Sequence, residues 1–263
     1  MKRLLIFIFL LLTNLFVTFA CFWDYDTIEM ERQQFPSVIE LISGKFLRHS
    51  PEYHYWRIKD REKKIKEHPD SLNFYDDLAV SYSKIGDDKK AIELMFLKEK
   101  KQPKQYETYA NLGTFYLHDG QFEKGIEYID KAIKINPEAH FGREIYQKYL
   151  AEYVLSKMKD GKITLPLDRD FPHSPDYLVY SSNKGNNFYK LLLSKHNKKL
   201  LNLNQDTVKD LPEEELEKAI IGIMGMMKFG NYNSPILLET LGDLLLNNGR
   251  GDAARQLAAR AYF

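Results

Sequence analysis

The amino-acid sequence predicts an all-α protein, an α-solenoid of helix-turn-helix repeats arranged in two helical lobes. Three observations lead to this fold class. A set of anchor residues recurs at an interval of 34 residues, the apolar residues in each interval follow the spacing of one helix face, and a proline closes each interval. A unit of this length cannot bury its apolar face alone, so we expect neighbouring units to stack.

The first element is a predicted secretory signal peptide over residues 1–20. Lys2 and Arg3 precede an apolar run from Leu4 to Ala20, which is the usual layout of such a signal. We therefore expect an exported protein, located in the periplasm or cell envelope. An uncleaved anchor helix is the alternative, because the apolar run has about the minimum length that spans a bilayer.

Cys21, the only cysteine, directly follows the predicted signal peptide. Its position resembles that of the lipid-modified cysteine in bacterial lipoproteins. The motif of those proteins usually places leucine three residues before the cysteine and a small residue two before, whereas this chain has Thr18 and Phe19. A lipid anchor at Cys21 and an ordinary thiol both remain open, while a disulfide within the chain is excluded because Cys21 has no partner.

Residues 21–68 form a predicted N-terminal helical segment whose beginning is rich in carboxylates. Asp24, Asp26, Glu29 and Glu31 are oxygen ligands of the kind that hard cations prefer, but their spacing lacks the glycine turn of a calcium loop. Asp26 with Glu29 instead fits a capping box at the start of a helix. We therefore predict a helix cap here and no metal site.

Two more helices follow in this segment, each opened by a capping signal. The second one precedes Pro69, which lies 34 residues before Pro103, so we interpret it as the last helix of a degenerate repeat. The signals are Ser37 with Glu40, for a helix to about Arg48, and Ser50 with Pro51, for a helix from Glu52 to His68.

Residues 69–139 contain two tandem units. In each unit an aromatic residue, a leucine and a second aromatic residue share one helix face, a glycine permits the turn to the second helix, and a proline ends that helix. The second unit has Phe122 and Ala132 where the first has Asp88 and Lys98. The anchors are Tyr75, Leu78, Tyr82, Gly86, Ala91 and Pro103 in the first unit, and Tyr109, Leu112, Gly113, Tyr116, Gly120 and Pro137 in the second.

This residue set resembles the tetratricopeptide repeat. The resemblance implies that the first helix of each unit lines a concave groove that binds a protein or peptide. Some members of that family hold the terminal carboxylate of a peptide with lysine and asparagine, but this chain has Asp76 and Val80 at two of those places, so we do not expect such a ligand. The groove positions implied here are Asn73, Asp76, Val80, Ser83, Lys84, Glu107, Ala110, Thr114, Leu117 and His118.

The rest of the chain continues the helical pattern. We predict a capping helix over residues 140–159, a proline-containing linker over residues 160–184, and a C-terminal helical lobe over residues 185–263. Whether the two lobes form one continuous stack or hinge at the linker stays open. A third unit in the C-terminal lobe is indicated by Leu238, Leu241, Gly242, Leu245, Gly249, Ala254 and Ala261.

Composition and motifs narrow the function. Lys and Arg total 38 against 37 Asp and Glu, a net charge of +1, which gives no electrostatic reason to expect nucleic acid or an anionic membrane as a partner. Contact with a membrane is expected only through a lipid anchor or an uncleaved signal. The chain has no nucleophile elbow, phosphate-binding loop or paired cysteine motif, so we predict no catalytic residue, no metal and no cofactor.

The expected function is therefore that of an exported interaction or scaffolding module without enzymatic activity. Two alternatives remain. The carboxylates of residues 24–31, with a histidine from another helix, could form a metal-dependent hydrolytic site. The chain could also be a structural spacer that is anchored by lipid at Cys21.

Overall fold

The structure is a computed structural model that describes residues 35–137, 143–167, 186–247, 257 and 259–261. The predicted signal peptide, Cys21 and the carboxylate-rich segment lie outside the described residues. No described helix is both long and apolar enough to cross a bilayer. The described elements are all helices, in the order α3 (Val38–Ile42), α4 (Pro51–Glu67), α5 (Asn73–Lys84), α6 (Asp88–Lys101), α7 (Tyr106–His118), α8 (Phe122–Ile135), α9 (Arg143–Lys157), α10 (Phe188–Asn202), α11 (Glu213–Phe229) and α12 (Pro235–Leu246).

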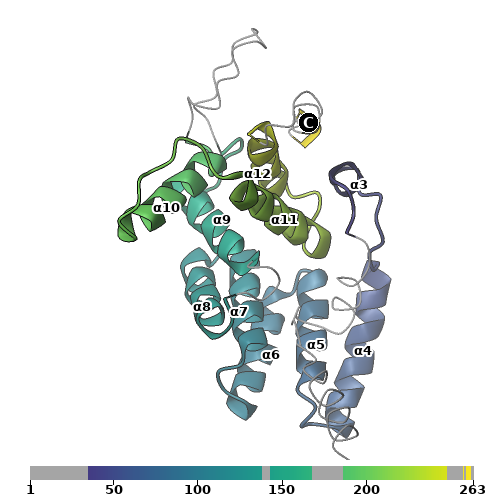
Figure 1. The fold of residues 1–263 in the computed structure, drawn as a ribbon. Coiled ribbons are helices and arrows are strands. Elements are labelled where there is room, and N and C mark those ends of the chain that lie inside the picture. Colours follow the sequence, from purple (N-terminus) through teal and green to yellow (C-terminus); the bar gives the residue numbers. More distant parts are fainter. Residues whose placement is uncertain (1–34, 138–142, 168–185, 248–256, 258, 262–263) are drawn as a thin grey trace, which may run out of the picture.

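Two helix pairs occupy the positions of the predicted tandem units, α5 with α6 and α7 with α8 (Figure 1). Gly86 and Gly120 lie in the turns within the pairs, with φ of +88° and +77°. This backbone region is open to glycine without strain. The residue after each glycine donates its N–H to the carbonyl of an anchor tyrosine, at 2.9 Å in the first turn and 2.8 Å in the second. The two turns are therefore equivalent.

The predicted anchors form the interior of these pairs. Leu78, Ala91 and Leu112 are buried, and so are the rings of Tyr75 and Tyr116. Burying each leucine contributes roughly 1.5–3 kcal/mol. The remaining two anchor tyrosines are half-buried and donate their hydroxyls to glutamates: Tyr82 to Glu62 at 2.8 Å and Tyr109 to Glu99 at 2.9 Å.

The N-terminal helices agree with the capping signals at their starts. The side chains of Ser37 and Glu40 form the reciprocal capping box of α3, and Ser50 caps α4. Helix α3 ends at Ile42, earlier than the predicted end near Arg48. The reason is Gly44, whose φ of +68° interrupts the helical backbone.

Helices α9 to α12 lie at one end of the stack, as Figure 1 shows. Helix α9 contacts α8 and also α11, so it lies between the repeats and the C-terminal helices and joins them into one array. A second core cluster forms here from α9 to α12 and includes Leu41 of α3. Phe122 of α8 packs against it, which explains why an aromatic residue follows the turn in the second unit.

The segment predicted as a linker begins as an ordered chain. Leu167 is buried in the second core cluster, and its backbone N–H donates to Glu239 at 2.9 Å. Residues 168–184 lie outside the described part. Of the predicted third unit, α12 supplies the first helix and Ala261 is buried, whereas Gly249 and Ala254 lie outside the described residues.

Candidate functional site

The ten residues that the repeat pattern places in a groove lie on α5 and α7, and we call the side of these helices that carries them the inner face. Their exposure varies widely, so only part of the inner face is open to a partner. Asn73, Lys84 and His118 are exposed, Ser83, Glu107, Thr114 and Leu117 are half-buried, and Asp76, Val80 and Ala110 are buried.

The burial of three of these residues differs from the prediction that they contact a ligand. Val80 and Ala110 belong to the core cluster of α4 to α8, which also contains Phe229 from α11. Asp76 is 7% exposed and has partners inside the protein. Leu117 points to α8, because a Cβ atom at Gly125 would lie 2.5 Å from its Cδ2 atom. It fills the space that this glycine leaves.

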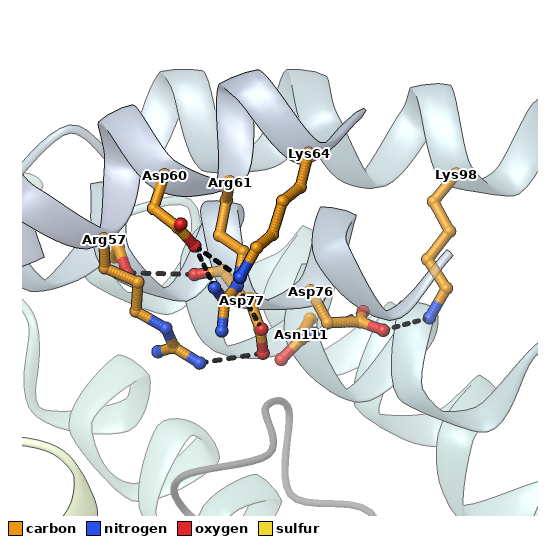
Figure 2. A network of polar contacts seen from close by, with 9 residues as sticks. Arg57, Asp60, Arg61, Lys64, Asp76, Asp77, Lys98 and Asn111 are labelled. Atoms are coloured by element: carbon orange, nitrogen blue, oxygen red, sulfur yellow. Dashed lines mark hydrogen bonds and ion pairs between the residues drawn. The ribbon is translucent and has the colours of Figure 1, made fainter. Parts of the chain in front are cut away.

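Asp76 is held in a buried polar network (Figure 2). Its Oδ2 atom lies 2.5 Å from Nζ of Lys98, and its Oδ1 atom accepts a hydrogen bond of 3.1 Å from Asn111. Burial raises the pKa of the Asp76 carboxyl to about 7, while the attraction of Lys98 acts in the opposite direction. Asp76 thus connects α5, α6 and α7 and is not available to a ligand.

A second network lies beside the first and joins α4 to α5. Asp77 receives two guanidinium groups, from Arg57 at 2.8 Å and from Arg61 at 2.6 Å, and Figure 2 shows both pairs. Asp60 pairs in turn with Arg61 and with Lys64. Arg57 is fully buried. Since buried ions need partners, this network fixes the position of α4 relative to α5.

The C-terminal end of α11 lies against the inner face. The Lys84 ammonium donates to the carbonyl oxygens of Phe229 and of Gly230, the latter at 3.1 Å. The Phe229 ring is 6% exposed and lies 5.0 Å from the Arg143 guanidinium carbon. A lysine at this place suits the helix end, because the last carbonyls of a helix lack partners within it and carry partial negative charge.

Helix α9 covers another part of the inner face. Gln147 donates its side-chain amide to Thr114 at 3.0 Å, and Tyr106 donates its hydroxyl to Glu144 at 2.6 Å. Thr114 is thereby engaged within the molecule. The middle of the inner face is occupied by the protein's own contacts.

Three polar side chains gather where α5 and α7 end, and we call them the Ser83–Asp88–His118 cluster. Ser83 donates its hydroxyl to Asp88 at 2.6 Å, and the Nδ1 atom of His118 lies 3.2 Å from Ser83 Oγ and 3.5 Å from Asp88 Oδ1. The His118 side chain is 47% exposed. The cluster combines a hydroxyl, a carboxylate and an imidazole from both helix pairs at the surface.

Comparison with known families matches part of this architecture. Residues 106–138 fit the model of the tetratricopeptide repeat, and the described part of this range contains α7, α8 and the turn that joins them. The chain therefore contains a tetratricopeptide repeat. Such repeats generally bind proteins or peptides and are typically not enzymatic. A comparison with curated protein sequences gave no match.

The α5–α6 pair is a tetratricopeptide-like unit with a modified interior. The residues that lie 34 positions after Asp76 and Lys98 are Ala110 and Ala132, and both alanines are buried. The first unit therefore has an ion pair where the tetratricopeptide unit matched by the family model has two small apolar residues. Lys98 stood out in the sequence as a departure from the repeat pattern, but its partner did not.

The contacts of two further residues, Asp88 and Phe229, could not be predicted from the sequence. In the sequence, Asp88 differs from the aromatic residue of the second unit, but its place in the Ser83–Asp88–His118 cluster depends on a histidine from the next repeat. Phe229 gave no signal, because its contact with the tetratricopeptide units joins distant parts of the chain. Among the described residues, no group of three or more His, Cys, Asp or Glu side chains is arranged to hold a metal ion.

Proposed function

We propose that the chain is an exported, non-enzymatic interaction module that binds a protein or peptide segment at the open end of its inner face. Binding of proteins or peptides is the general role of the repeat that the chain contains. The proposal of export to the periplasm or cell envelope rests on the basic and then apolar sequence of residues 1–20. Cell fractionation that finds the chain in the cytoplasm would contradict it.

The observation that carries the binding proposal is the Ser83–Asp88–His118 cluster. It lies at the end of the inner face where the neighbouring Lys84 binds the end of α11, but its own three side chains take no part in the contacts with α9 and α11 described above. Its groups donate and accept hydrogen bonds at adjacent points on two repeats. A peptide backbone offers the matching N–H and carbonyl groups, so a segment that crosses from α5 to α7 would satisfy both repeats at once.

The test compares capture of proteins from an envelope extract by the full-length chain and by its Ser83→Ala/His118→Ala variant. These side chains are not part of the two hydrophobic cores, so we expect the variant to fold normally. Loss of two hydrogen bonds at an interface costs about 1–3 kcal/mol. We therefore expect capture of the proteins that the unmodified chain enriches to fall about fivefold or more.

The matched control is His68→Ala/Ser71→Ala, which removes the same side-chain types next to the opposite end of α5. This variant should enrich the same proteins as the unmodified chain. Equal enrichment by the cluster variant, with an unchanged circular dichroism spectrum, would reject the cluster as the binding site. Equal loss in both variants would do so as well.

A further inference from the structure

The nearly neutral charge of the whole chain conceals an uneven distribution. Helix α10 carries four lysines and one histidine within 15 residues and has no acidic side chain. The lysines are Lys190, Lys195, Lys198 and Lys199. A basic helix of this kind with apolar residues among its lysines is typical of surfaces that bind membranes or acidic partners.

One side of α10 is bound to the protein and the other is open. Phe188, Tyr189 and Leu192 are buried in the core of the C-terminal lobe. The opposite side of the helix borders a shallow surface hollow, and all of the residues that line it come from α10, at the spacing of a single helix face. They are Lys190, Leu193, Ser194, Asn197, Lys198 and Leu201.

The end of α10 exposes apolar and charged side chains together. Leu201 is 59% exposed and Leu203 is 58% exposed, which is a large fraction for leucine. In the described part of the chain, Lys198 and Lys199 form no ion pair with a carboxylate, whereas Lys195 pairs with Glu152 of α9. The last turn of α10 therefore has Lys198 and Leu201 together on the outer side, while Lys199 and Leu203 are exposed next to them at the end of the helix.

The chain holds this end of the helix in a fixed position. The side-chain amide of Asn197 accepts from the backbone N–H of Val208 at 2.8 Å and donates to the Val208 carbonyl at 2.9 Å. These two hydrogen bonds fold the segment after Leu203 back onto α10. The exposed leucines and lysines are thus displayed on an ordered surface.

We propose that the outer side of α10, with Leu203, binds the surface of an anionic phospholipid membrane. The lysines contact the lipid phosphates, and the leucines enter the boundary between headgroups and acyl chains. The hollow along α10 is shallow and open, and one helix alone lines it, which suits a lipid surface better than an acidic protein helix. This inference concerns a different face from the inner face and does not depend on the proposed function.

The experiment measures binding of the full-length chain to vesicles by cosedimentation. Vesicles of phosphatidylcholine alone are compared with vesicles that also contain phosphatidylglycerol. The apolar residues 4–20 are expected to contribute similarly to both, so the ratio of the two affinities reports the electrostatic contact. We expect tighter binding to the anionic vesicles and slower amide hydrogen exchange in residues 188–203 when they are bound.

The variant Lys198→Glu/Lys199→Glu should weaken binding to the anionic vesicles by about tenfold or more and leave binding to the neutral vesicles unchanged. The matched control is Lys100→Glu/Lys101→Glu, which reverses two adjacent lysines in the last turn of α6 and should bind like the unmodified chain. Equal loss in both variants, or no preference for anionic vesicles, would overturn the proposal. Protection of residues 188–203 by polyglutamate but not by anionic vesicles would overturn it in favour of an acidic protein partner.

Discussion

At the scale of single residues, the two helix pairs of the repeats differ in the buried side chains between their helices. Asp76 and Lys98 form an ion pair in the first, and Ala110 and Ala132 take the corresponding places in the second. A buried ion pair compensates a large cost of desolvation, whereas two alanines have no such cost. The ion pair therefore contributes little net stability, but removing either of its two residues alone should lower the free energy of unfolding.

This difference predicts how replacements at the pair combine. Asp76→Ala leaves the Lys98 ammonium buried without its partner, and Lys98→Ala leaves the buried Asp76 carboxyl with Asn111 as its remaining partner, so each should lower the free energy of unfolding, by up to about 3–5 kcal/mol. The double variant reproduces the alanines of the second pair and should be more stable than either single variant. Urea denaturation at neutral pH measures all three. A double variant that loses the sum of the single effects would show that the two residues do not interact.

The pH dependence of stability provides a second readout of the same pair. Because the pKa of Asp76 is raised to about 7 in the folded chain, the folded state binds a proton that the unfolded state releases at lower pH. The contribution of Asp76 to stability is thus complete below about pH 4 and is lost as the pH rises through about 7. The double alanine variant should lack this part of the slope.

At the scale of the helices, α7 and α8 approach each other so closely that only glycine fits at two of their contact positions. A Cβ atom at Gly113 would lie 2.5 Å from Cγ1 of Ile129 and 3.1 Å from its backbone nitrogen. Gly125 contacts α7 in the same way through Leu117. The first pair has Ala79 and Ala91 at these places, so its two helices accommodate a Cβ atom at positions where the second pair has none.

We therefore predict that Gly113→Ala destabilises the chain. In an exposed helix the same change would stabilise by about 1 kcal/mol, but here the overpacking against Ile129 costs about 1–3 kcal/mol. Thermal unfolding should show a lower Tm for Gly113→Ala. Ser194→Ala, on the exposed side of α10, serves as the control, with a Tm equal to or above that of the unmodified chain. A raised Tm for Gly113→Ala would mean that α8 shifts away without cost.

At the scale of the whole molecule, α11 links the C-terminal helices to the first repeat. Phe229 lies in the core of α4 to α8, and Lys84 binds the carbonyls at the end of α11. The array is thus connected twice, once through α9 and once through this contact. The lobes do not form an open stack in which each element touches only its neighbours.

Removing the Phe229 ring should loosen this second connection. Truncation of a buried phenylalanine costs about 3–5 kcal/mol, so Phe229→Ala should lower the free energy of unfolding by that amount. Amide exchange should rise at the C-terminal ends of α5 and α11 and change less in α7 and α8. Phe96→Ala, at a ring on the surface of α6, should have a much smaller effect. Uniform exchange changes across all helices would contradict a local role for Phe229.

The sequence predicted the parts of this molecule that depend on neighbouring residues. The turns at Gly86 and Gly120 and the caps at Ser37 and Ser50 follow from local backbone requirements. The burial of Asp76, Val80 and Ala110 was not predictable from neighbouring residues. Helix periodicity assigns a residue to a face, but Lys98 and Phe229, which lie far along the chain, determine whether that face is open.

The contact of Phe229 and Lys84 also changes how the array can respond to load. A linear solenoid behaves as a spring, since small rotations between successive repeats add up to a large change of curvature. Here the path from α5 through α7, α9 and α11 returns to α5 and closes a ring. A closed ring of contacts resists both stretching and bending until one of the contacts breaks. Under an applied force, the described repeats should therefore remain rigid until the contact between Lys84 and the end of α11 breaks.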